Sequence, residues 1–190
     1  MVHYLFDLYL PKDNSKENYG LIVYLHAGGF TTGDKEDDKG ILEWLCSKGY
    51  VTAGINYTLR TNENNASVYS QSMEVKEAIP VIVEEAKKLG YNLNEMAVSG
   101  GSAGGTLAML YAYRDAKDSP IPVKMMFEMV GPSSFFAEDW DNYGLDKNNV
   151  DYKYFETSHS GHGLQNDSKV YREFLDTVVQ YLDKYMPVEQ

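Results

Sequence analysis

Apolar and polar residues alternate over residues 3–10, and a continuous, branched apolar run follows at residues 19–25. Alternation is typical of a half-buried strand, and a continuous apolar run of this length is typical of a strand buried on both faces. The polar turn cluster at residues 12–18 separates the two. The pattern therefore predicts two antiparallel strands joined by a hairpin-like loop.

From residue 35 onward, several segments space their apolar residues as an amphipathic helix does. Residues 35–48 place Ile41, Trp44 and Leu45 on one face and end at Gly49, a typical residue just past a helix. A second amphipathic helix is expected at 68–89, where Pro80 should cause a kink or a break. Further helices are predicted at 103–114 and 170–186, and further strands at 50–57, 95–99, 124–130 and 152–156.

Strands that alternate with helices of this length imply parallel crossovers. We therefore expect an α/β fold, with a mainly parallel sheet covered by helices on both faces and an antiparallel first hairpin. No linker or repeat interrupts the chain, so residues 1–190 are expected to form a single domain. In such sheets the chemistry gathers at the carboxyl ends of the strands.

The chain is acidic, with a formal net charge of -11. Its field would repel nucleic acids and anionic membranes, and neither is expected as a partner. The single cysteine, Cys46, lies in an apolar helical stretch and offers neither an internal disulfide nor a cysteine-based metal site. Residues 1–10 lack a signal-peptide pattern, and no apolar run approaches about 18 residues. A cytoplasmic location is therefore the expectation.

The sequence Gly100-Gly101-Ser102-Ala103-Gly104 has the pattern G-x-S-x-G between a predicted strand and a predicted helix. Small residues two positions before and after the serine allow a turn tight enough to lift its hydroxyl clear of the sheet. Ser102 is thus the candidate nucleophile. A glycine-rich packing turn is the alternative, while a phosphate cradle is disfavoured because no lysine follows the glycines.

His26-Ala27-Gly28-Gly29-Phe30 follows the second predicted strand. Consecutive glycines can turn their N–H groups toward one oxygen, as the tetrahedral intermediate of acyl transfer requires. Gly28 and Gly29 are the expected donors, together with the N–H of Ala103 at the start of the helix after the serine. His26 is interpreted as a loop anchor, held by a hydrogen bond from its ring to the backbone, rather than as a base.

Two histidines, His159 and His162, lie in a loop before the last predicted helix. A histidine placed there can reach across the sheet, take the proton of the serine and return it to the leaving alcohol. His162 has a glycine on either side and is the candidate general base, whereas His159 is interpreted as structural. The order of serine before histidine is the order found in α/β-hydrolases.

In these motifs the chain resembles esterases of the α/β-hydrolase fold, in the hormone-sensitive-lipase-like and feruloyl-esterase-like group. The matching stretches are YLHAGGF, TTGDK, INYTLR, VSGGSAGG, VGPSSF and HSGHGL. The resemblance implies Ser102 as nucleophile, His162 as base and the N–H groups of Gly28, Gly29 and Ala103 as the oxyanion hole, with no cofactor. Ala27 replaces the middle glycine of the family's H-G-G-G loop.

The chain departs from this family where a catalytic acid is expected. Only residues 131–151 separate the strands predicted at 124–130 and 152–156, too few for a further strand with two helices. We therefore expect the penultimate strand and any cap to be missing. Asp139 or Asp141 could supply the acid, Ser102 and His162 could act as a dyad, or the chain could be a catalytically silent relative.

The sequence thus predicts a serine hydrolase that acts on a small or flexible carboxylic ester through an acyl-serine intermediate. The alternative is a ligand-binding protein on a hydrolase scaffold, which the missing acid segment motivates. A small-molecule ester is the expected partner, and no metal is expected. A shortened sheet would expose an edge strand, so a homodimer across that edge is a further hypothesis.

Overall fold

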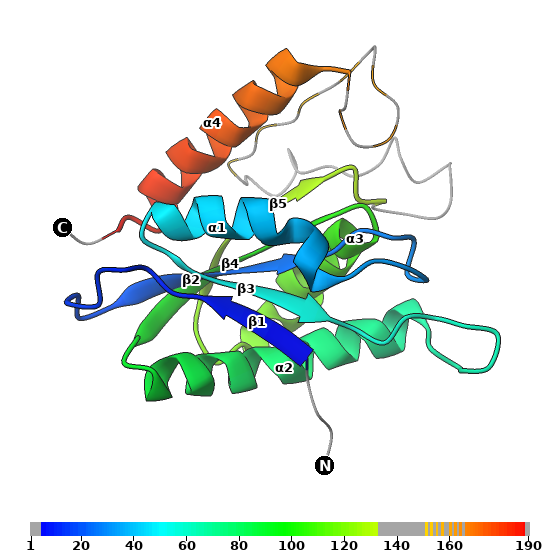
Figure 1. Ribbon diagram of the computed structural model, residues 1–190, viewed down its shortest axis with the longest axis horizontal. Coiled ribbons are helices and arrows are strands. Elements are labelled where there is room, and N and C mark those ends of the chain that lie inside the picture. The colour runs from blue at the N-terminus through cyan, green and yellow to red at the C-terminus, as the bar shows by residue number, and fades with distance from the viewer. Residues whose placement is uncertain are drawn as a thin grey trace.

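The computed structural model describes residues 5–132, 151, 153, 155, 157, 160, 162, 164 and 166–188. Its centre is one five-stranded sheet with the order β1-β3-β2-β4-β5 (Figure 1). The strands are β1 (Leu5–Tyr9), β2 (Tyr19–Leu25), β3 (Val51–Asn56), β4 (Leu93–Gly101) and β5 (Val123–Met129). All neighbours pair in parallel except β1 and β3. The mainly parallel sheet predicted from the sequence is confirmed.

The expected hairpin between the first two strands is wrong. β1 is antiparallel, but it pairs with β3, with Leu5 opposite Asn56. β2 lies between β3 and β4, where nearly all its residues are buried. Burial explains the difference, because a continuous apolar strand needs helices on both faces and strands on both sides. The alternating β1, with Leu5 62% exposed, instead forms an edge.

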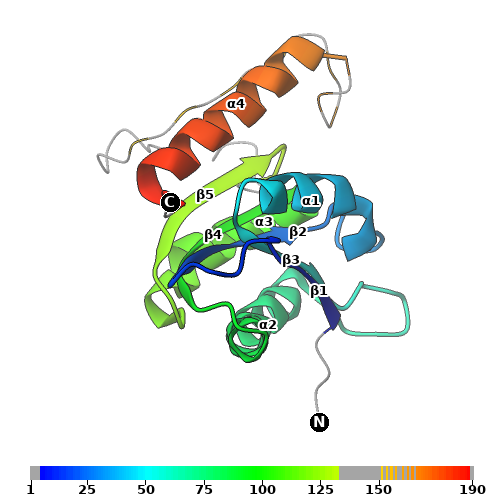
Figure 2. The same cartoon turned by 60° about the vertical axis from the view of Figure 1, so that its left-hand side comes forward.

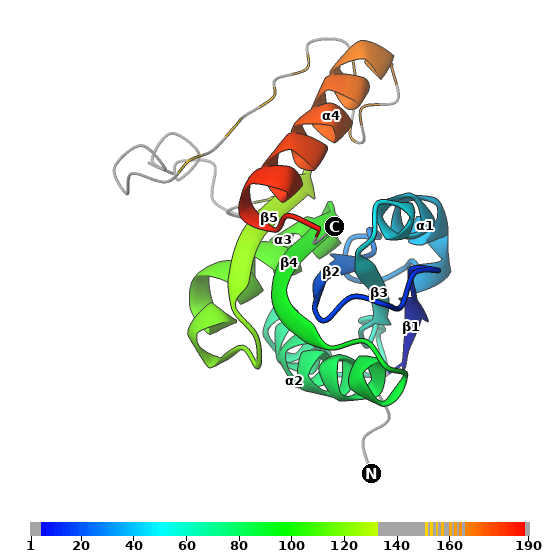
Figure 3. The same cartoon turned by 90° about the vertical axis from the view of Figure 1, so that its left-hand side faces the viewer.

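Helices cover both faces of the sheet. α1 (Lys39–Ser47) and α4 (Ser168–Tyr185) pack on one face, and α2 (Val68–Lys88) and α3 (Ala103–Leu110) on the other. Figures 1 and 2 show α1 and α2 on opposite sides of the strands, and Figure 3 shows α4 beside β5. Alternate residues of β2 therefore enter two apolar clusters, Val23 on the α2 side and Ile22 on the α1 side.

Several helices differ from their predicted form. α2 continues through Pro80, so the predicted break is absent, while the predicted kink stays a prediction. Pro80 is exposed, and the backbone carbonyl that it leaves without a donor can bond water. The helix expected at 35–48 begins with a 3₁₀ turn, η1 (Lys35–Asp38), before α1. The one expected at 103–114 ends at Leu110 and continues as a π-helical turn, η2 (Tyr111–Asp115), and a 3₁₀ turn, η3 (Ala116–Asp118).

The strand expected at residues 152–156 is wrong for its described residues. Lys153 and Phe155 lie outside any strand. Phe155 packs edge to face on Phe174 of α4, with ring centroids 6.1 Å apart. Packing against a helix has thus replaced strand pairing at this position. Among the described residues no helix is both long and apolar enough to cross a membrane.

Candidate active site

Ser102 occupies a strained turn between β4 and α3. Its backbone has φ 50° and ψ -116°, in a region that side-chain-bearing residues rarely adopt. The turn is held on both sides, since the N–H of Ser102 donates to the carbonyl of Met129 at 2.8 Å and the N–H of Thr106 donates to the carbonyl of Ser102 at 3.1 Å. Such strain persists only where the surroundings enforce it.

The two flanking glycines of the G-x-S-x-G pattern are required by close backbone contact. A Cβ on Gly100 would lie 2.4 Å from the carbonyl carbon of Gly104 and 2.7 Å from the carbonyl oxygen of Leu25. A Cβ on Gly104 would lie only 1.9 Å from that same oxygen. The glycines let α3 approach the end of β2, as expected from the motif. This packing is compatible with the nucleophile interpretation, because it creates the turn that exposes Ser102.

The structure brings His162 to Ser102. The ring Nε2 of His162 lies 2.7 Å from the Oγ of Ser102, a hydrogen-bond distance across 60 residues of sequence. The side chain is exposed, but its loop is anchored by buried Leu164 and by a hydrogen bond from the N–H of Asn166 to the Oγ of Ser160. With its proton on Nδ1, the ring can accept the serine proton at Nε2.

The loop over residues 26–33 supplies backbone N–H groups near the end of β2. Gly28, Gly29 and Phe30 all have positive φ, at 127°, 58° and 68°. The carbonyl of Gly28 accepts from the N–H groups of Thr31 and Thr32, which closes a tight turn. Within the described part of the chain, no hydrogen bond uses the N–H of Gly28 or Gly29. Gly29 is exposed, and a Cβ added to it would meet no other atom within 4 Å.

The third predicted donor is the N–H of Ala103. As the first residue of α3, Ala103 has no acceptor within the helix for its N–H. It directly follows Ser102, so this N–H lies next to the hydroxyl and at the positive end of the helix dipole.

His26 anchors the loop, as predicted. It is 1% exposed, and its Nδ1 lies 2.7 Å from the carbonyl of Ala27, which requires the proton on Nδ1. The ring stacks on Tyr57, with centroids 4.2 Å apart, and the hydroxyl of Tyr57 donates to the carbonyl of His26. These contacts leave His26 inside the fold, away from solvent.

The predicted acids Asp139 and Asp141 lie outside the described residues, as does His159. No carboxylate among the described residues hydrogen-bonds the ring of His162. Asp151 accepts hydrogen bonds from Lys184, Tyr185 and Tyr181 on α4 instead. The ammonium of Lys184 and the two hydroxyls lower the pKa of Asp151 to about 2. The carboxylate of Asp151 therefore binds side chains of α4 and not the ring of His162.

Comparison with known proteins shows the family to which this chain belongs. Residues 6–173 match the BD-FAE family. The chain belongs to the BD-FAE family. The match covers β2, the Ser102 turn and the His162 loop, and it confirms the resemblance to esterases and lipases of the α/β-hydrolase fold.

Two curated relatives of this BD-FAE chain are esterases by name. Esterase LipI of Mycobacterium tuberculosis is 26% identical over 110 residues, which is 56% of this chain and 33% of LipI. Ethyl acetate hydrolase of Pseudomonas putida is 26% identical over 124 residues, which is 64% of this chain and 38% of that enzyme. The matched part thus spans about a third of each of these relatives.

Solved structures show the same fold. Esterase 2 of Thermogutta terrifontis in its apo form has a TM-score of 0.77 and 16% identity, covering 100% of this chain and 92% of the esterase. Its propionate-bound form has a TM-score of 0.78 and 17% identity, with the same coverage. At this identity the likeness establishes the fold, and the BD-FAE chain is an α/β-hydrolase in architecture.

Groups at the end of β5 and just after it hold the Ser102 turn and the start of α3, and the sequence did not predict them. Besides the carbonyl of Met129, the carbonyl of Pro132 accepts from the hydroxyl of Thr106 on α3 at 2.8 Å. Glu128, opposite Gly100 in the sheet, accepts from the N–H of Gly131 at 2.5 Å. Burial raises the pKa of Glu128. Most of these acceptors are backbone carbonyls, which leave no residue-type signal in a sequence.

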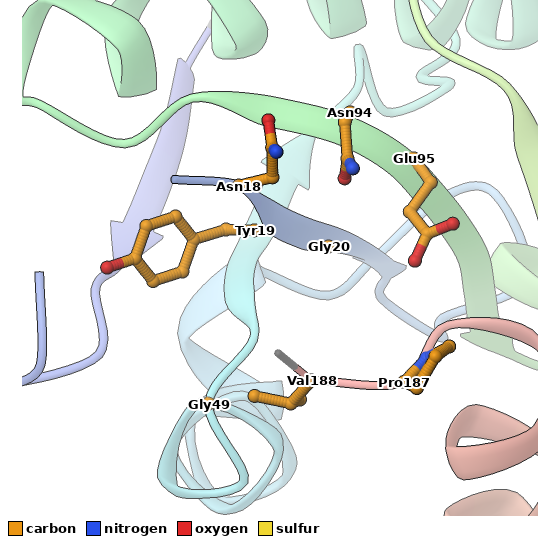
Figure 4. A pocket seen from close by; sticks show the side chains of 8 residues that line it. All are labelled: Asn18, Tyr19, Gly20, Gly49, Asn94, Glu95, Pro187 and Val188. Carbon is orange, nitrogen blue, oxygen red and sulfur yellow. The ribbon is translucent and has the colours of Figure 1, made fainter. Parts of the chain in front are cut away.

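A cavity of about 220 Å³ lies elsewhere, at the amino end of the strands. Asn18, Asn94 and Glu95 line one side, and Pro187 and Val188 approach from the C-terminal segment (Figure 4). Ser102 and His162 lie at the opposite, carboxyl end of the sheet, so this cavity is separate from the candidate site. No group of three metal-ligating side chains occurs among the residues that the structure describes.

Proposed function

We propose that this protein is a serine hydrolase of carboxylic esters that works through an acyl-serine intermediate. One observation carries the proposal, namely the 2.7 Å contact between Ser102 Oγ and His162 Nε2 at a strained turn. A hydroxyl in this position is a weak nucleophile until a base takes its proton. The names of the two curated relatives, an esterase and an ethyl acetate hydrolase, support the same reaction class.

The chemistry follows in two halves. Ser102 Oγ attacks the ester carbonyl carbon while its proton passes to His162 Nε2, and the new oxyanion accepts hydrogen bonds from Gly28, Gly29 and Ala103. The carbon–oxygen bond to the alcohol then breaks, and His162 returns the proton to the leaving alcohol. In the second half, His162 takes a proton from water, the hydroxide attacks the acyl-serine, and the acid leaves as Ser102 regains its proton.

We propose esters with short acyl groups as the first substrates to test. Structures of Thermogutta terrifontis esterase 2 carry bound propionate and butyrate, and others are phosphorylated by paraoxon. Asp139 and Asp141 stay the candidates for the acid that orients His162. If no acid does so, Ser102 and His162 act as a catalytic dyad.

A serine-reactive fluorophosphonate probe tests the proposal. We expect one adduct on the peptide that contains Ser102, no adduct in Ser102→Ala, and normal labelling in Ser47→Ala, which alters an exposed serine at the end of α1. His162→Ala should reduce turnover of p-nitrophenyl acetate by about 10²- to 10⁴-fold. Folded protein without labelling or turnover would refute hydrolysis and favour a ligand-binding protein on this scaffold.

A further inference from the structure

The loop that carries the proposed oxyanion donors is held by a buried glutamine that the mechanism does not use. Gln71 lies in the first turn of α2 and is fully buried. Its side-chain nitrogen donates to the carbonyl of Phe30 at 2.9 Å and to the carbonyl of Thr58 at 2.7 Å. One amide group therefore ties the loop after β2 to the connection between β3 and α2.

The direction of this amide is set by its neighbours. Both acceptors are carbonyl oxygens, which cannot donate, so the NH₂ end of Gln71 must face them. The other end, Oε1, is buried without a hydrogen-bond partner among the described residues. The feature that distinguishes glutamine here is its pair of donors.

Phe30 is the position where such a tether matters most. It has φ 68° although it carries a side chain, and it directly follows Gly29. The carbonyl of Phe30 accepts both from Gln71 and from the backbone N–H of Arg60 at 2.9 Å. A backbone held in a strained conformation needs such external bonds, because it would otherwise relax toward negative φ. Phe30 lies inside the turn that the N–H groups of Thr31 and Thr32 close on the carbonyl of Gly28, so relaxation at Phe30 would disturb the turn that presents the N–H groups of Gly28 and Gly29.

We infer that Gln71 is a positioning residue for the oxyanion hole. Its two N–H groups hold the carbonyl of Phe30 in place, and they thereby aim the N–H groups of Gly28 and Gly29 at the oxygen that becomes negative. The inference rests on the proposed ester hydrolysis. Because the oxyanion forms only during the reaction, loss of this tether acts on the transition state more than on the bound ester.

Two variants test the inference. Gln71→Glu keeps the shape but replaces the two donors by oxygen, and Gln71→Met keeps the length without charge or donor. The matched control is Ser72→Ala, since Ser72 is also buried in α2 but bonds Tyr69 and Arg114 rather than the loop. The rate of p-nitrophenyl acetate hydrolysis is divided by the concentration of Ser102 that the fluorophosphonate probe labels. Unfolded protein therefore does not lower the measured kcat.

For both Gln71 variants we expect kcat to fall about 10- to 100-fold with KM within about threefold of the unaltered protein. The affinity for a trifluoromethyl ketone, which forms an oxyanion on Ser102, should fall by the same factor, while that for the matching methyl ketone should not. Ser72→Ala should keep its kcat. At acid pH the carboxyl introduced by Gln71→Glu regains one donor, and the deficit of that variant should shrink.

The inference is overturned if both Gln71 variants keep kcat within about threefold, or if Ser72→Ala loses as much as they do. An unaltered protein that neither labels at Ser102 nor turns over ester overturns the proposed function itself. Normal labelling and turnover in the unaltered protein, with normal kcat in the variants, removes only the role of Gln71. The two failures are thus distinguishable.

Discussion

Replacing Gly104 by alanine tests how closely α3 approaches β2. The added methyl would lie 1.9 Å from the carbonyl oxygen of Leu25, whereas a comfortable C···O contact is about 3.3 Å. The backbone would therefore have to separate by about 1.4 Å, because the obstructing atom belongs to the main chain and cannot rotate away. Overpacking of this kind costs about 3 kcal/mol, and alanine returns about 1 kcal/mol through its higher helix propensity.

We therefore expect Gly104→Ala to lose about 2 kcal/mol in the free energy of unfolding, or about 4–8 °C in Tm for a chain of this size. Leu25 and His26 begin the loop of the proposed oxyanion hole, so the same displacement should lower kcat about 100-fold in the molecules that remain folded. Urea unfolding followed by intrinsic fluorescence measures the first effect. Hydrolysis of p-nitrophenyl acetate per titrated Ser102 measures the second.

Gly101→Ala is the matched control for stability. Its methyl would lie 3.6 Å from the hydroxyl oxygen of Tyr24 and 3.8 Å from the Cβ of Ala27, which are ordinary contacts. Its free energy of unfolding should change by less than about 1 kcal/mol. A Gly104→Ala variant as stable as the unaltered protein would mean that α3 does not approach β2 this closely in solution.

Two further predictions concern charge and strain. Burial raises the pKa of Asp38 to about 7, so between about pH 4 and 7 the folded protein holds a proton that the unfolded chain has released, and stability falls as pH rises through that window. Urea unfolding at pH 5 and pH 8 measures the free energy of unfolding of Asp38→Asn relative to that of the unaltered protein. This difference should shift in favour of the variant by on the order of 2 kcal/mol from pH 5 to pH 8, and an equal difference at both pH values would contradict the prediction. Ser102→Gly should be more stable than Ser102→Ala by about 1 kcal/mol, because φ 50° strains alanine and not glycine. Thermal unfolding compares these two variants, and identical Tm values would mean that the turn is unstrained.

The local pattern predicted much of the fold. The buried run at β2 and the amphipathic face of α4 lie within a residue or two of their expected bounds, because periodicity reports which faces are buried. Strand pairing was predicted less well. β1 was expected beside β2, since neighbours in sequence often pair, yet it pairs with β3. Pairing depends on the order in which strands bury their faces, and no single segment contains that information.

Local sequence was enough to predict the residue types and the turns of the candidate site. A serine between glycines and a glycine pair after a buried strand require particular backbone shapes, and those shapes formed at Ser102 and Gly28. The groups that these turns contact follow from the packing of distant segments. The 2.7 Å contact of Ser102 with His162 and the tether from Gln71 to Phe30 span 60 and 41 residues of chain. Such contacts form when distant segments pack on one sheet, and their partners include backbone carbonyls that every residue carries.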